Sequence, residues 1–245
     1  MKGTLKGIFI ILLAIIIFSC GKKEEKITNN RVFVIGTNAE YPPFEYLENG
    51  KIVGLDAEII ETIFQKLGYK YNWVNMEFGG LISALQTGKI DMIIAGMSIT
   101  PERSKMVKFT SPYLTSKVAV ITNKKNPIKN MNDLENKKYG AELGTTKENT
   151  AKNIPGSIVI PYQNNTSALL ALKNNQIDGI VLDESVANEY VKNNSDLLLV
   201  GVLEGEPKAI ALGKNEIDYD KINETLIELV NDGTIEKLKE KYKVK

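Results

Sequence analysis

Histidine is missing from the 245-residue sequence, and cysteine occurs once, at Cys20. The absence of histidine removes the commonest general base, the usual zinc ligand and every nucleophile activated by a Ser–His or Cys–His pair. A single cysteine cannot form a disulfide within the chain. We therefore expect a fold held by packing alone, without a metal site or a cofactor.

An excess of either charge is also missing. Lys and Arg number 31 and Asp and Glu 30, so the charge balance predicts neither a nucleic-acid partner nor an anionic surface. Hydrophobic residues make up 43% of the chain and charged residues 25%, which is typical of a soluble globular protein. The length allows one large domain or two small ones.

The longest apolar run, Ile8 to Phe18, is too short to cross a bilayer, which takes about 20 residues. Lys2 and Lys6 precede this run, and the small residue Ser19 follows it. This order of charge, apolar stretch and small residue predicts that residues 1–19 are a secretory signal peptide.

The segment Ile17-Phe18-Ser19-Cys20 resembles the lipobox of bacterial lipoproteins, in which the cysteine is acylated after cleavage. Phe18 departs from that pattern, since a small residue is usual there. We predict a lipid anchor at Cys20, with the polar residues 20–30 as a tether between lipid and domain. A secreted protein cut nearby and a retained leader are the alternatives.

From Arg31 onward, strand-like and helix-like segments alternate. Runs of β-branched and apolar residues predict strands, and apolar positions three and four residues apart predict helices. The expected strands are residues 31–36, 69–74, 90–95 and 139–143, and the expected helices are residues 56–67, 80–86 and 185–191. This alternation predicts an α/β fold.

One pattern occurs twice, 87 residues apart. Ala84-Leu85 followed by Ile90-Asp91-Met92-Ile93 returns as Ala171-Leu172 followed by Ile177-Asp178-Gly179-Ile180. The offset is too long for a solenoid, so two similar α/β lobes explain it better, although a chance match stays open. Ligands of α/β sheets bind beyond the carboxyl ends of strands, and we expect two such ends, residues 95–98 and 182–184, to share a cleft.

The segment Thr100-Pro101-Glu102-Arg103 predicts the start of a helix, because Thr100 suits the cap and Pro101 the first position. Arg103 is then a cation in the first turn, where the helix dipole disfavours it. A ligand carboxylate that accepts a bidentate bond from the guanidinium would remove this penalty. Taken alone, a surface arginine that is solvated or paired with Glu102 is the simpler interpretation.

Two polar segments follow strands of the second repeat. Thr145 and Glu148 predict a capping box, so Gly144 and Thr146 lie either at a well-capped helix or at a second set of N–H donors for a carboxylate. Asp183 follows an apolar strand and is either a helix N-cap or the acceptor for a ligand ammonium.

Aromatic residues occupy stiff loops at strand ends. Tyr41 and Phe44 flank two prolines, and Phe78 precedes two glycines. Such rings form either the walls of a small-ligand pocket or the core of a lobe, and we expect Phe44 in the core.

The segments Gly36–Glu45, Gly54–Asp56, Gly80–Leu85 and Ala95–Arg103 occur in this order behind the leader. Together they resemble the polar amino-acid group of ABC-transporter substrate-binding proteins, relatives of the lysine/arginine/ornithine- and glutamine-binding proteins. The resemblance runs from about Arg31 to the C-terminus.

The resemblance implies a two-lobed periplasmic-binding-protein-like fold of type II, with two α/β lobes joined by two hinge strands. Lobe 1 would comprise residues 31–115 and 208–245, and lobe 2 residues 116–207. The apolar pieces Val118–Thr122 and Ala209–Leu212 would be the crossings.

The resemblance also implies which residues contact a ligand. Arg103 would clamp the α-carboxylate, helped by Ser98 and by the backbone at Gly96 and Thr146. Asp183, on the opposite lobe, would hold the α-ammonium.

Other contacts follow from the same resemblance. Ala95 or Ser98 would assist Asp183 with the ammonium, and Tyr41 and Phe78 would enclose the aliphatic part of the side chain. Asn38 stands where relatives often have Asp, which weakens an assignment to lysine or arginine. Glu142 is unusual for its position and either restores a negative charge in the pocket or faces solvent.

We therefore predict a monomeric, lipid-anchored, extracytoplasmic protein that captures a free amino acid, polar or basic, and delivers it to the membrane permease of an ABC importer. No catalytic residue is expected. A sensor that reports to a receptor is one alternative. The other is a dehydratase for prephenate or arogenate on a similar fold, which needs a free acid that only Glu142 can supply.

Overall fold

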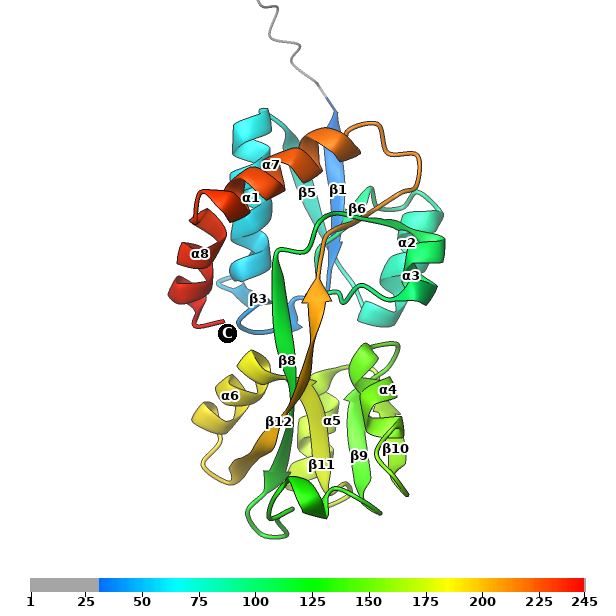
Figure 1. Ribbon diagram of the computed structural model, residues 1–245, viewed down its shortest axis with the longest axis vertical. Coiled ribbons are helices and arrows are strands. Elements are labelled where there is room, and N and C mark those ends of the chain that lie inside the picture. The colour runs from blue at the N-terminus through cyan, green and yellow to red at the C-terminus, as the bar shows by residue number, and fades with distance from the viewer. Residues whose placement is uncertain (1–30, 245) are drawn as a thin grey trace, which may run out of the picture.

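The structure, a computed structural model, describes residues 31–244. The predicted signal peptide, Cys20 and the predicted tether up to residue 30 lie outside this part. Two α/β lobes are joined by a pair of long strands (Figure 1), which confirms the predicted two-lobed fold. Between residues 31 and 244, no helix has the length and apolar character needed to cross a membrane.

The first lobe is built on a five-stranded sheet in the order β5–β1–β6–β13–β7. Its strands are β1 (Val32–Thr37), β5 (Lys70–Asn75), β6 (Met92–Ile93), β7 (Lys108–Phe109) and β13 (Ala211–Leu212). β1 is parallel to β5 and β6, whereas β13 is antiparallel to β6 and β7. A small antiparallel sheet contains β2 (Glu40–Tyr41), β3 (Glu45–Glu48) and β4 (Lys51–Val53).

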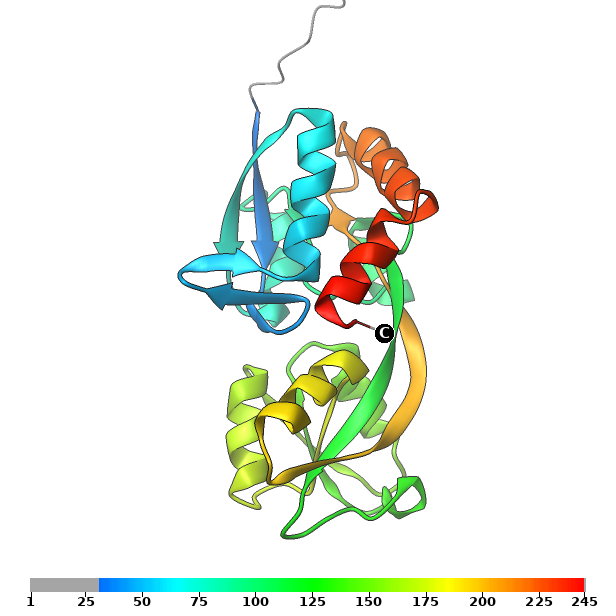
Figure 2. The same ribbon diagram turned by 90° about the vertical axis from the view of Figure 1, so that its left-hand side faces the viewer.

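Helices cover both faces of this first sheet. They are α1 (Leu55–Leu67), the 3-10 helix η1 (Phe78–Gly80), α2 (Leu81–Gln86), α3 (Pro101–Met106), α7 (Tyr219–Asn231) and α8 (Thr234–Tyr242). α1, α7 and α8 pack together on one side, which faces the viewer in Figure 2, and α2 and α3 lie on the other.

Helix α1 shows how local sequence sets an element. Its apolar stripe, including Ile59 and Ile63, is fully buried. Gly54 precedes the helix with φ 122°, and a Cβ there would lie 2.3 Å from the carbonyl oxygen of Phe44, so only glycine fits. Gly68 ends the helix in the left-handed conformation.

The second lobe repeats this design with a sheet in the order β10–β9–β11–β8–β12. Its strands are β8 (Leu114–Asn123), β9 (Lys138–Glu142), β10 (Ile158–Tyr162), β11 (Gly179–Asp183) and β12 (Leu197–Lys208). Its helices are η2 (Met131–Asp133), α4 (Thr146–Lys152), α5 (Asn165–Lys173) and α6 (Glu184–Asn193). In both sheets, the first three strands of the order pair in parallel, and the remaining two pairings are antiparallel.

The repeated sequence pattern has one structural role in both lobes. The carboxylate of Asp91 accepts a bond from the Val34 N–H at 2.7 Å, and that of Asp178 accepts one from the Lys138 N–H at 2.8 Å. In return, the backbone N–H of Asp91 donates to the carbonyl of Val34, and that of Asp178 donates to the carbonyl of Lys138. Each aspartate therefore fixes the start of its strand, β6 or β11, against the neighbouring strand, β1 or β9.

The lobes are joined by a two-stranded ribbon at one end of β8 and β12. There Leu114–Lys117 pairs with Gly205–Lys208, and the predicted lobe boundaries lie in this ribbon. The predicted crossing at Val118–Thr122 is wrong, because these residues pair with β11 inside the second sheet. Ala211–Leu212 likewise forms β13 of the first sheet. The apolar residues belong to sheet centres, where burial is complete, and not to the crossings.

The other predicted elements differ from the observed ones by one or two residues at their ends, except the strand predicted at residues 90–95. Only Met92–Ile93 forms β6. Its partner β13 has just two residues, and the chain turns at Gly96 with φ 51°. Every residue of the segment except Asp91 is nevertheless buried, as its apolar sequence indicates.

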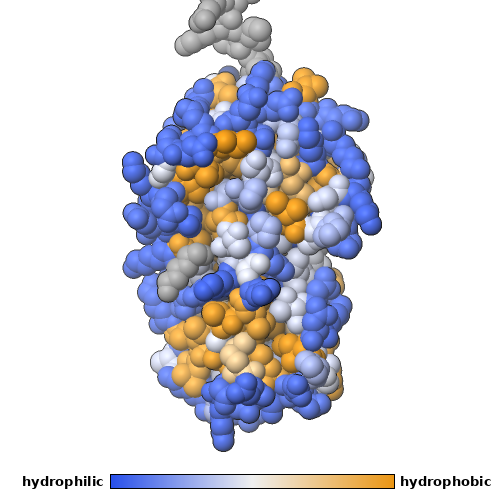
Figure 3. All heavy atoms as spheres, in the orientation of Figure 1, coloured by the Kyte–Doolittle hydropathy of each residue, from blue (hydrophilic) through white to orange (hydrophobic). Residues whose placement is uncertain are grey.

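Apolar side chains gather at the surface of the second lobe on the face shown in Figure 3. β12 is the edge strand of the second sheet, and Leu198, Leu199 and Val202 on it are 38–39% exposed. The register of β12 shifts twice along its pairing with β8. Such bulges hinder pairing of an edge strand with another chain.

Truncation of the core of the second lobe tests this packing. Ile180 in β11 is 0% exposed, so Ile180→Ala should lower the free energy of unfolding by about 2–5 kcal/mol. Ile158 in β10 is 58% exposed, so Ile158→Ala should cost about 1 kcal/mol at most. Denaturant unfolding of both variants measures the difference, and equal losses would contradict the assigned burial.

Candidate functional site

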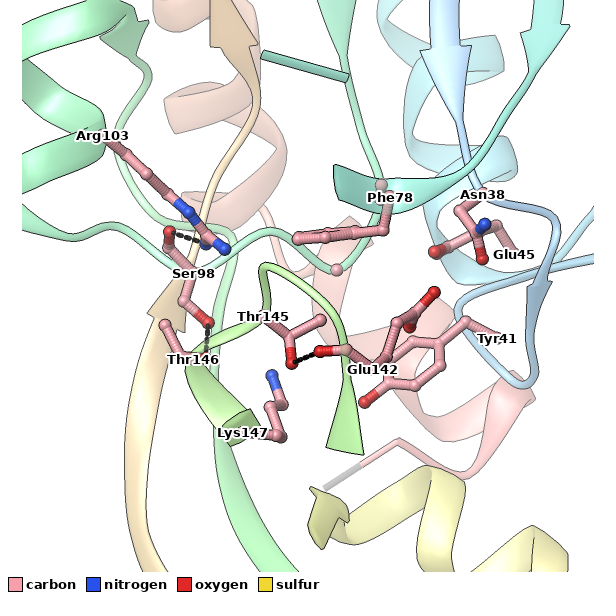
Figure 4. A pocket seen from close by; sticks show the side chains of 12 residues that line it. Asn38, Tyr41, Glu45, Phe78, Ser98, Arg103, Glu142, Thr145, Thr146 and Lys147 are labelled. Carbon is pink, nitrogen blue, oxygen red and sulfur yellow. Dashed lines mark hydrogen bonds between the residues drawn. The ribbon is translucent and has the colours of Figure 1, made fainter. Parts of the chain in front are cut away.

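A narrow pocket lies between the lobes, where loops of the first lobe meet the start of α4 (Figure 4). Its lining residues are Asn38, Tyr41, Glu45, Phe78, Ala95, Gly96, Ser98, Arg103, Glu142, Thr145, Thr146 and Lys147. All the predicted ligand contacts are among them except Asp183. That residue is fully buried and is reached from the pocket only through contacts with Tyr41 and Lys147, which line it.

Arg103 forms one end of the pocket. Thr100 caps α3 by accepting a bond from the Arg103 N–H at 3.2 Å, and Pro101 is the first residue of the helix. The guanidinium donates to the carbonyl of Ser98 at 2.7 Å and to that of Gly144, on the other lobe, at 3.0 Å. It also lies over the ring of Phe78, 5.2 Å from the centroid.

The side chain of Arg103 is therefore not solvated, and the interpretation as a surface arginine is wrong. Only 7% of the residue is exposed, and this burial lowers the pKa of the guanidinium. A guanidinium has five N–H groups, and two of them serve these bonds. The others remain for a planar anion such as a carboxylate.

The capping box predicted at the start of α4 is half correct. Thr145 accepts a bond from the Glu148 N–H, but the Glu148 carboxylate accepts from the N–H of Gly144 at 2.9 Å and not from that of Thr145. The carboxylate therefore fixes the turn that presents Gly144 to Arg103. Lys147 is the second residue of α4, and its side chain enters the pocket.

Asp183 ends β11 and stands at the N-cap position of α6 without making a capping bond. Its carboxylate instead binds the ammonium groups of Lys147, at 2.6 Å, and Lys208, at 2.9 and 3.1 Å. The hydroxyl of Tyr41 donates to it at 2.8 Å. Burial opposes ionisation, but Lys147 and then Lys208 outweigh it and lower the pKa of Asp183.

Lys208 connects Asp183 with the hinge ribbon and with Ser98. It is 0% exposed, and its ammonium donates to Ser98 Oγ at 2.8 Å. Ser98 Oγ in turn donates to Glu206 at 2.6 Å, and Thr146 Oγ1 donates to the same Glu206 oxygen. Burial lowers the pKa of Lys208 to about 7, although Asp183 opposes the shift. We refer to Asp183, Lys147, Lys208, Ser98 and Glu206 as the Asp183 cluster.

The opposite end of the pocket is acidic. Glu142 is 4% exposed, so it does not face solvent. One carboxylate oxygen accepts from Asn165 at 2.6 Å, and the other has no hydrogen-bond partner within residues 31–244. Burial, with a further contribution from Glu77, raises the pKa of Glu142 to about 7. Asn38 lies at the same end and donates to the carbonyl of Met76.

A pair of buried carboxyl groups, those of Glu45 and Asp56, borders the pocket. Asp56 accepts bonds from the Gly96 N–H at 2.7 Å and from the Tyr113 hydroxyl at 3.0 Å, and its carboxyl lies within hydrogen-bonding reach of Glu45. Burial raises the pKa of Asp56 to about 6, and burial followed by the charge of Asp56 raises the pKa of Glu45 well above its usual value. From these raised pKa values we expect the two carboxyl groups to hold one proton between them, and Asp56 fixes Gly96.

Sequence reasoning missed five residues of this region: Glu45, Asp56, Lys147, Glu206 and Lys208. Lys147 carries the signal that identified Arg103, since it too is a cation in the first turn of a helix. Lys208 directly precedes the apolar run Ala209–Leu212, where a buried lysine requires a buried partner. No local signal distinguishes Glu206.

The fold and the pocket together define a two-lobed solute-binding protein. The pocket, our candidate ligand site, lies between the lobes, with a buried cation at one end and buried carboxyl groups at the other. The chain belongs to the bacterial extracellular solute-binding proteins, family 3, whose family model matches residues 33–245.

Several known proteins are similar over most of this chain. A probable histidine-binding protein of Campylobacter jejuni is 37% identical over 100% of both chains. The solved structure of an ancestral arginine-binding protein bound to arginine has 41% identity and a TM-score of 0.80, and the match covers 86% of this chain and 97% of that one. An ancestral amino-acid-binding protein described as a precursor of cyclohexadienyl dehydratase has 35% identity and a TM-score of 0.78, with 86% and 95% covered.

The raised pKa values of Glu45 and Asp56 predict a stability that depends on pH. Both carboxyl groups have raised pKa values in the folded protein, so the folded state binds more protons than the unfolded state above about pH 4, and the free energy of unfolding should fall as the pH rises toward 8. Glu45→Gln should flatten this decrease, since an amide donates to Asp56 without titrating. Chemical unfolding of the wild type and of Glu45→Gln at pH 5 to 8 measures this dependence of the free energy of unfolding on pH.

Glu48→Gln is the matched control, because Glu48 lies on the same strand and is exposed. Its stability profile should follow that of the wild type. Parallel profiles for the wild type and Glu45→Gln would rule out the shared proton.

Proposed function

We propose that the protein captures a free amino acid with a cationic side chain between its lobes, outside the cytoplasm, and delivers it to the membrane permease of an ABC importer. The observation that carries this proposal is the polarity of the pocket. Arg103 forms one end, and Glu142, with Glu45 behind it, forms the other. An α-carboxylate and a cationic side chain match these two ends.

The carboxylate end is suited to a single orientation of the ligand. Arg103 is held in place by the carbonyl groups of Ser98 and Gly144, so its remaining N–H groups point in fixed directions. A guanidinium fixed in this way loses little entropy when it binds a carboxylate bidentately. Phe78, beside it, covers the aliphatic part of the ligand.

Glu142 carries the specificity for charge. Asn38 is neutral, so it does not select a cation, and the raised pKa of Glu142 means that its ionisation near neutral pH depends on a neighbouring positive charge. A guanidinium or ammonium on the ligand supplies this charge and pairs with the oxygen that lacks a partner. Histidine and arginine, the ligands in the names of two relatives, both have side chains that can be cationic.

Binding of the amino acid between the lobes also explains how it would be delivered to the permease. Arg103 and Tyr41 belong to the first lobe and Glu142 and Thr146 to the second, so a bound amino acid stabilises the closed form by contacts with both. The closed form is the one that the permease would recognise. We further propose that the chain is a monomer held to the membrane by a lipid on Cys20 and that it performs no reaction.

A dehydratase is the second candidate, favoured by one observation. Glu142 has a pKa of about 7 and lies in the pocket, so it can be protonated at neutral pH as a general acid must be. The likeness to a dehydratase precursor is in accord with this idea. Turnover of prephenate by the purified protein would establish it, and we expect none.

Isothermal titration against the common amino acids tests the proposed function. The domain from residue 31 onward, unfolded and refolded to remove bound ligand, should bind arginine, lysine or histidine with micromolar affinity or better. Arg103→Ala should weaken binding by about 30-fold or more, because loss of a buried charge partner costs at least about 2 kcal/mol. Lys105→Ala, an exposed change on the same helix, should have no effect. Absence of binding to every amino acid would refute the proposal.

The ionisation of Glu142 predicts a pH dependence of binding. L-Arginine stays cationic between pH 5.5 and 8, so its affinity should rise with pH as Glu142 ionises and level off above its pKa of about 7. The increase is limited to about tenfold per pH unit, with release of up to one proton. In Glu142→Gln, binding should be weaker and the rise absent. An unchanged slope would assign the titration to another group, such as Lys208.

A further inference from the structure

Lys147 stands between the pocket and the buried carboxylate of Asp183. Lys147 lines the pocket and Asp183 does not, and the Lys147 ammonium lies 2.6 Å from the Asp183 carboxylate. In Figure 4 the Lys147 side chain rises from the start of α4 into the pocket, between Thr146 and Tyr41. A ligand group that approaches Asp183 past Lys147 must displace this ammonium.

We propose that Lys147 is an internal competitor for the α-ammonium of the ligand. In the structure the Lys147 ammonium pairs with the Asp183 carboxylate. An incoming ligand α-ammonium displaces it, and Lys147 then pairs with the Glu206 carboxylate. This inference rests on the proposed function, because it assumes that the ligand is an α-amino acid.

The position of the ligand α-ammonium follows from Arg103. In an α-amino acid the ammonium and the carboxylate are borne by the same carbon atom, so the ammonium must lie close to the Arg103 end of the pocket. Two carboxylates are linked to Ser98, whose carbonyl accepts a bond from Arg103: Glu206 directly and Asp183 through Lys208. Glu206 already accepts bonds from Ser98 and Thr146 and its side chain is 26% exposed, whereas Asp183 is fully buried, so water screens a charge pair with Asp183 less.

Asp183 keeps a second cationic partner when Lys147 leaves it. The fully buried Lys208 contacts both of its carboxylate oxygens, and Tyr41 donates a further bond. Exchange of the Lys147 ammonium for a ligand ammonium replaces one cation by another, so it leaves no buried charge unpaired. The exchange therefore avoids the large cost of an isolated buried ion.

Glu206 provides the alternative position for Lys147. Its carboxylate lies 3.9 Å from the Lys147 ammonium, and its side chain is 26% exposed, so the lysine can reach it by a small change of its flexible stem. Lys147 is also a cation in the first turn of α4, where the helix dipole disfavours it. Both features make Lys147 a partner that a ligand can displace.

We expect competition by Lys147 to weaken the affinity of the wild type for an α-amino acid, and removal of the Lys147 ammonium to strengthen it. If Asp183 is open in a tenth of the molecules or fewer, the apparent affinity for an α-amino acid is reduced by about tenfold or more. A ligand without an α-ammonium does not need Asp183, so the same competition does not affect it.

Calorimetry with two matched ligands tests this inference. L-Arginine and 5-guanidinopentanoate differ only in the α-ammonium. Lys147→Met should bind L-arginine about tenfold or more tightly than the wild type does, and should bind 5-guanidinopentanoate no more tightly. Lys152→Met, at the exposed end of the same helix, should match the wild type with both ligands.

The outcomes separate the two proposals. If neither the wild type nor Lys147→Met binds any amino acid, both proposals fail. If the wild type binds L-arginine and Lys147→Met binds both ligands more weakly, Lys147 contacts the ligand carboxylate and only its role as a competitor is refuted. A stronger wild-type affinity for 5-guanidinopentanoate than for L-arginine would show that the ligand never replaces Lys147, and would also refute it.

A second measurement follows the displacement directly. In nitrogen-15 NMR of the ligand-free protein, the ammonium group of Lys147 should give a slowly exchanging signal that is absent from Lys147→Met. Addition of L-arginine should shift this signal or remove it. A signal that stays unchanged at saturating L-arginine would overturn the displacement.

Discussion

The fully buried charge of Asp183 is the constraint on which the arrangement of the lobes depends. Its partners come from three parts of the chain: Tyr41 from the first lobe, Lys147 from α4 of the second, and Lys208 from the hinge ribbon. A buried carboxylate that loses such partners costs several kcal/mol, so the closed form is stable only while these parts meet at one point. The ribbon residue Lys208 also bonds Ser98 of the first lobe, which ties the hinge to the carboxylate end of the pocket.

The carboxyl groups of the pocket divide into two kinds by their protonation. Asp183 is kept ionised by two ammonium groups, whereas burial favours the neutral form of Glu142 and of the Glu45–Asp56 pair. Asp56 serves the backbone, since it holds Gly96 and thus the loop that leads to Ser98. Glu142 has one oxygen without a partner in the described part of the chain, so it is the group whose charge state responds most directly to a ligand. In the proposed function, charge recognition therefore resides in Glu142, and the neighbouring carboxyl groups keep the shape of the pocket.

Most of the fold could be predicted from the sequence because its signals are local. Apolar periodicity located α1, and the repeated Ile-Asp pair located two strands whose aspartates bind the neighbouring strand. The crossings were misplaced because apolar runs mark buried sheet centres, while the ribbon that joins the lobes is set by pairing between distant segments. Among the residues of the pocket, Arg103 could be singled out by its unfavourable position in a helix, but only the family resemblance assigned it to a ligand, since a surface arginine was the simpler interpretation. Lys208 and Glu206 could not be singled out, since their roles arise only when the ribbon brings them beside Asp183.

The ion pairs of the Asp183 cluster also bear on how the lobes open without a ligand. Opening breaks the contacts of Tyr41 with Asp183 and of Arg103 with Gly144, since each joins one lobe to the other. The pair between Lys147 and Asp183 lies within the second lobe and survives the motion. Asp183 thus keeps a counter-ion in the open form, and the opened lobe presents a neutralised carboxylate to water. An empty site that carries its own cation opens at lower electrostatic cost, but the ligand must then compete with that cation. Easier opening and weaker binding are therefore two effects of the same lysine.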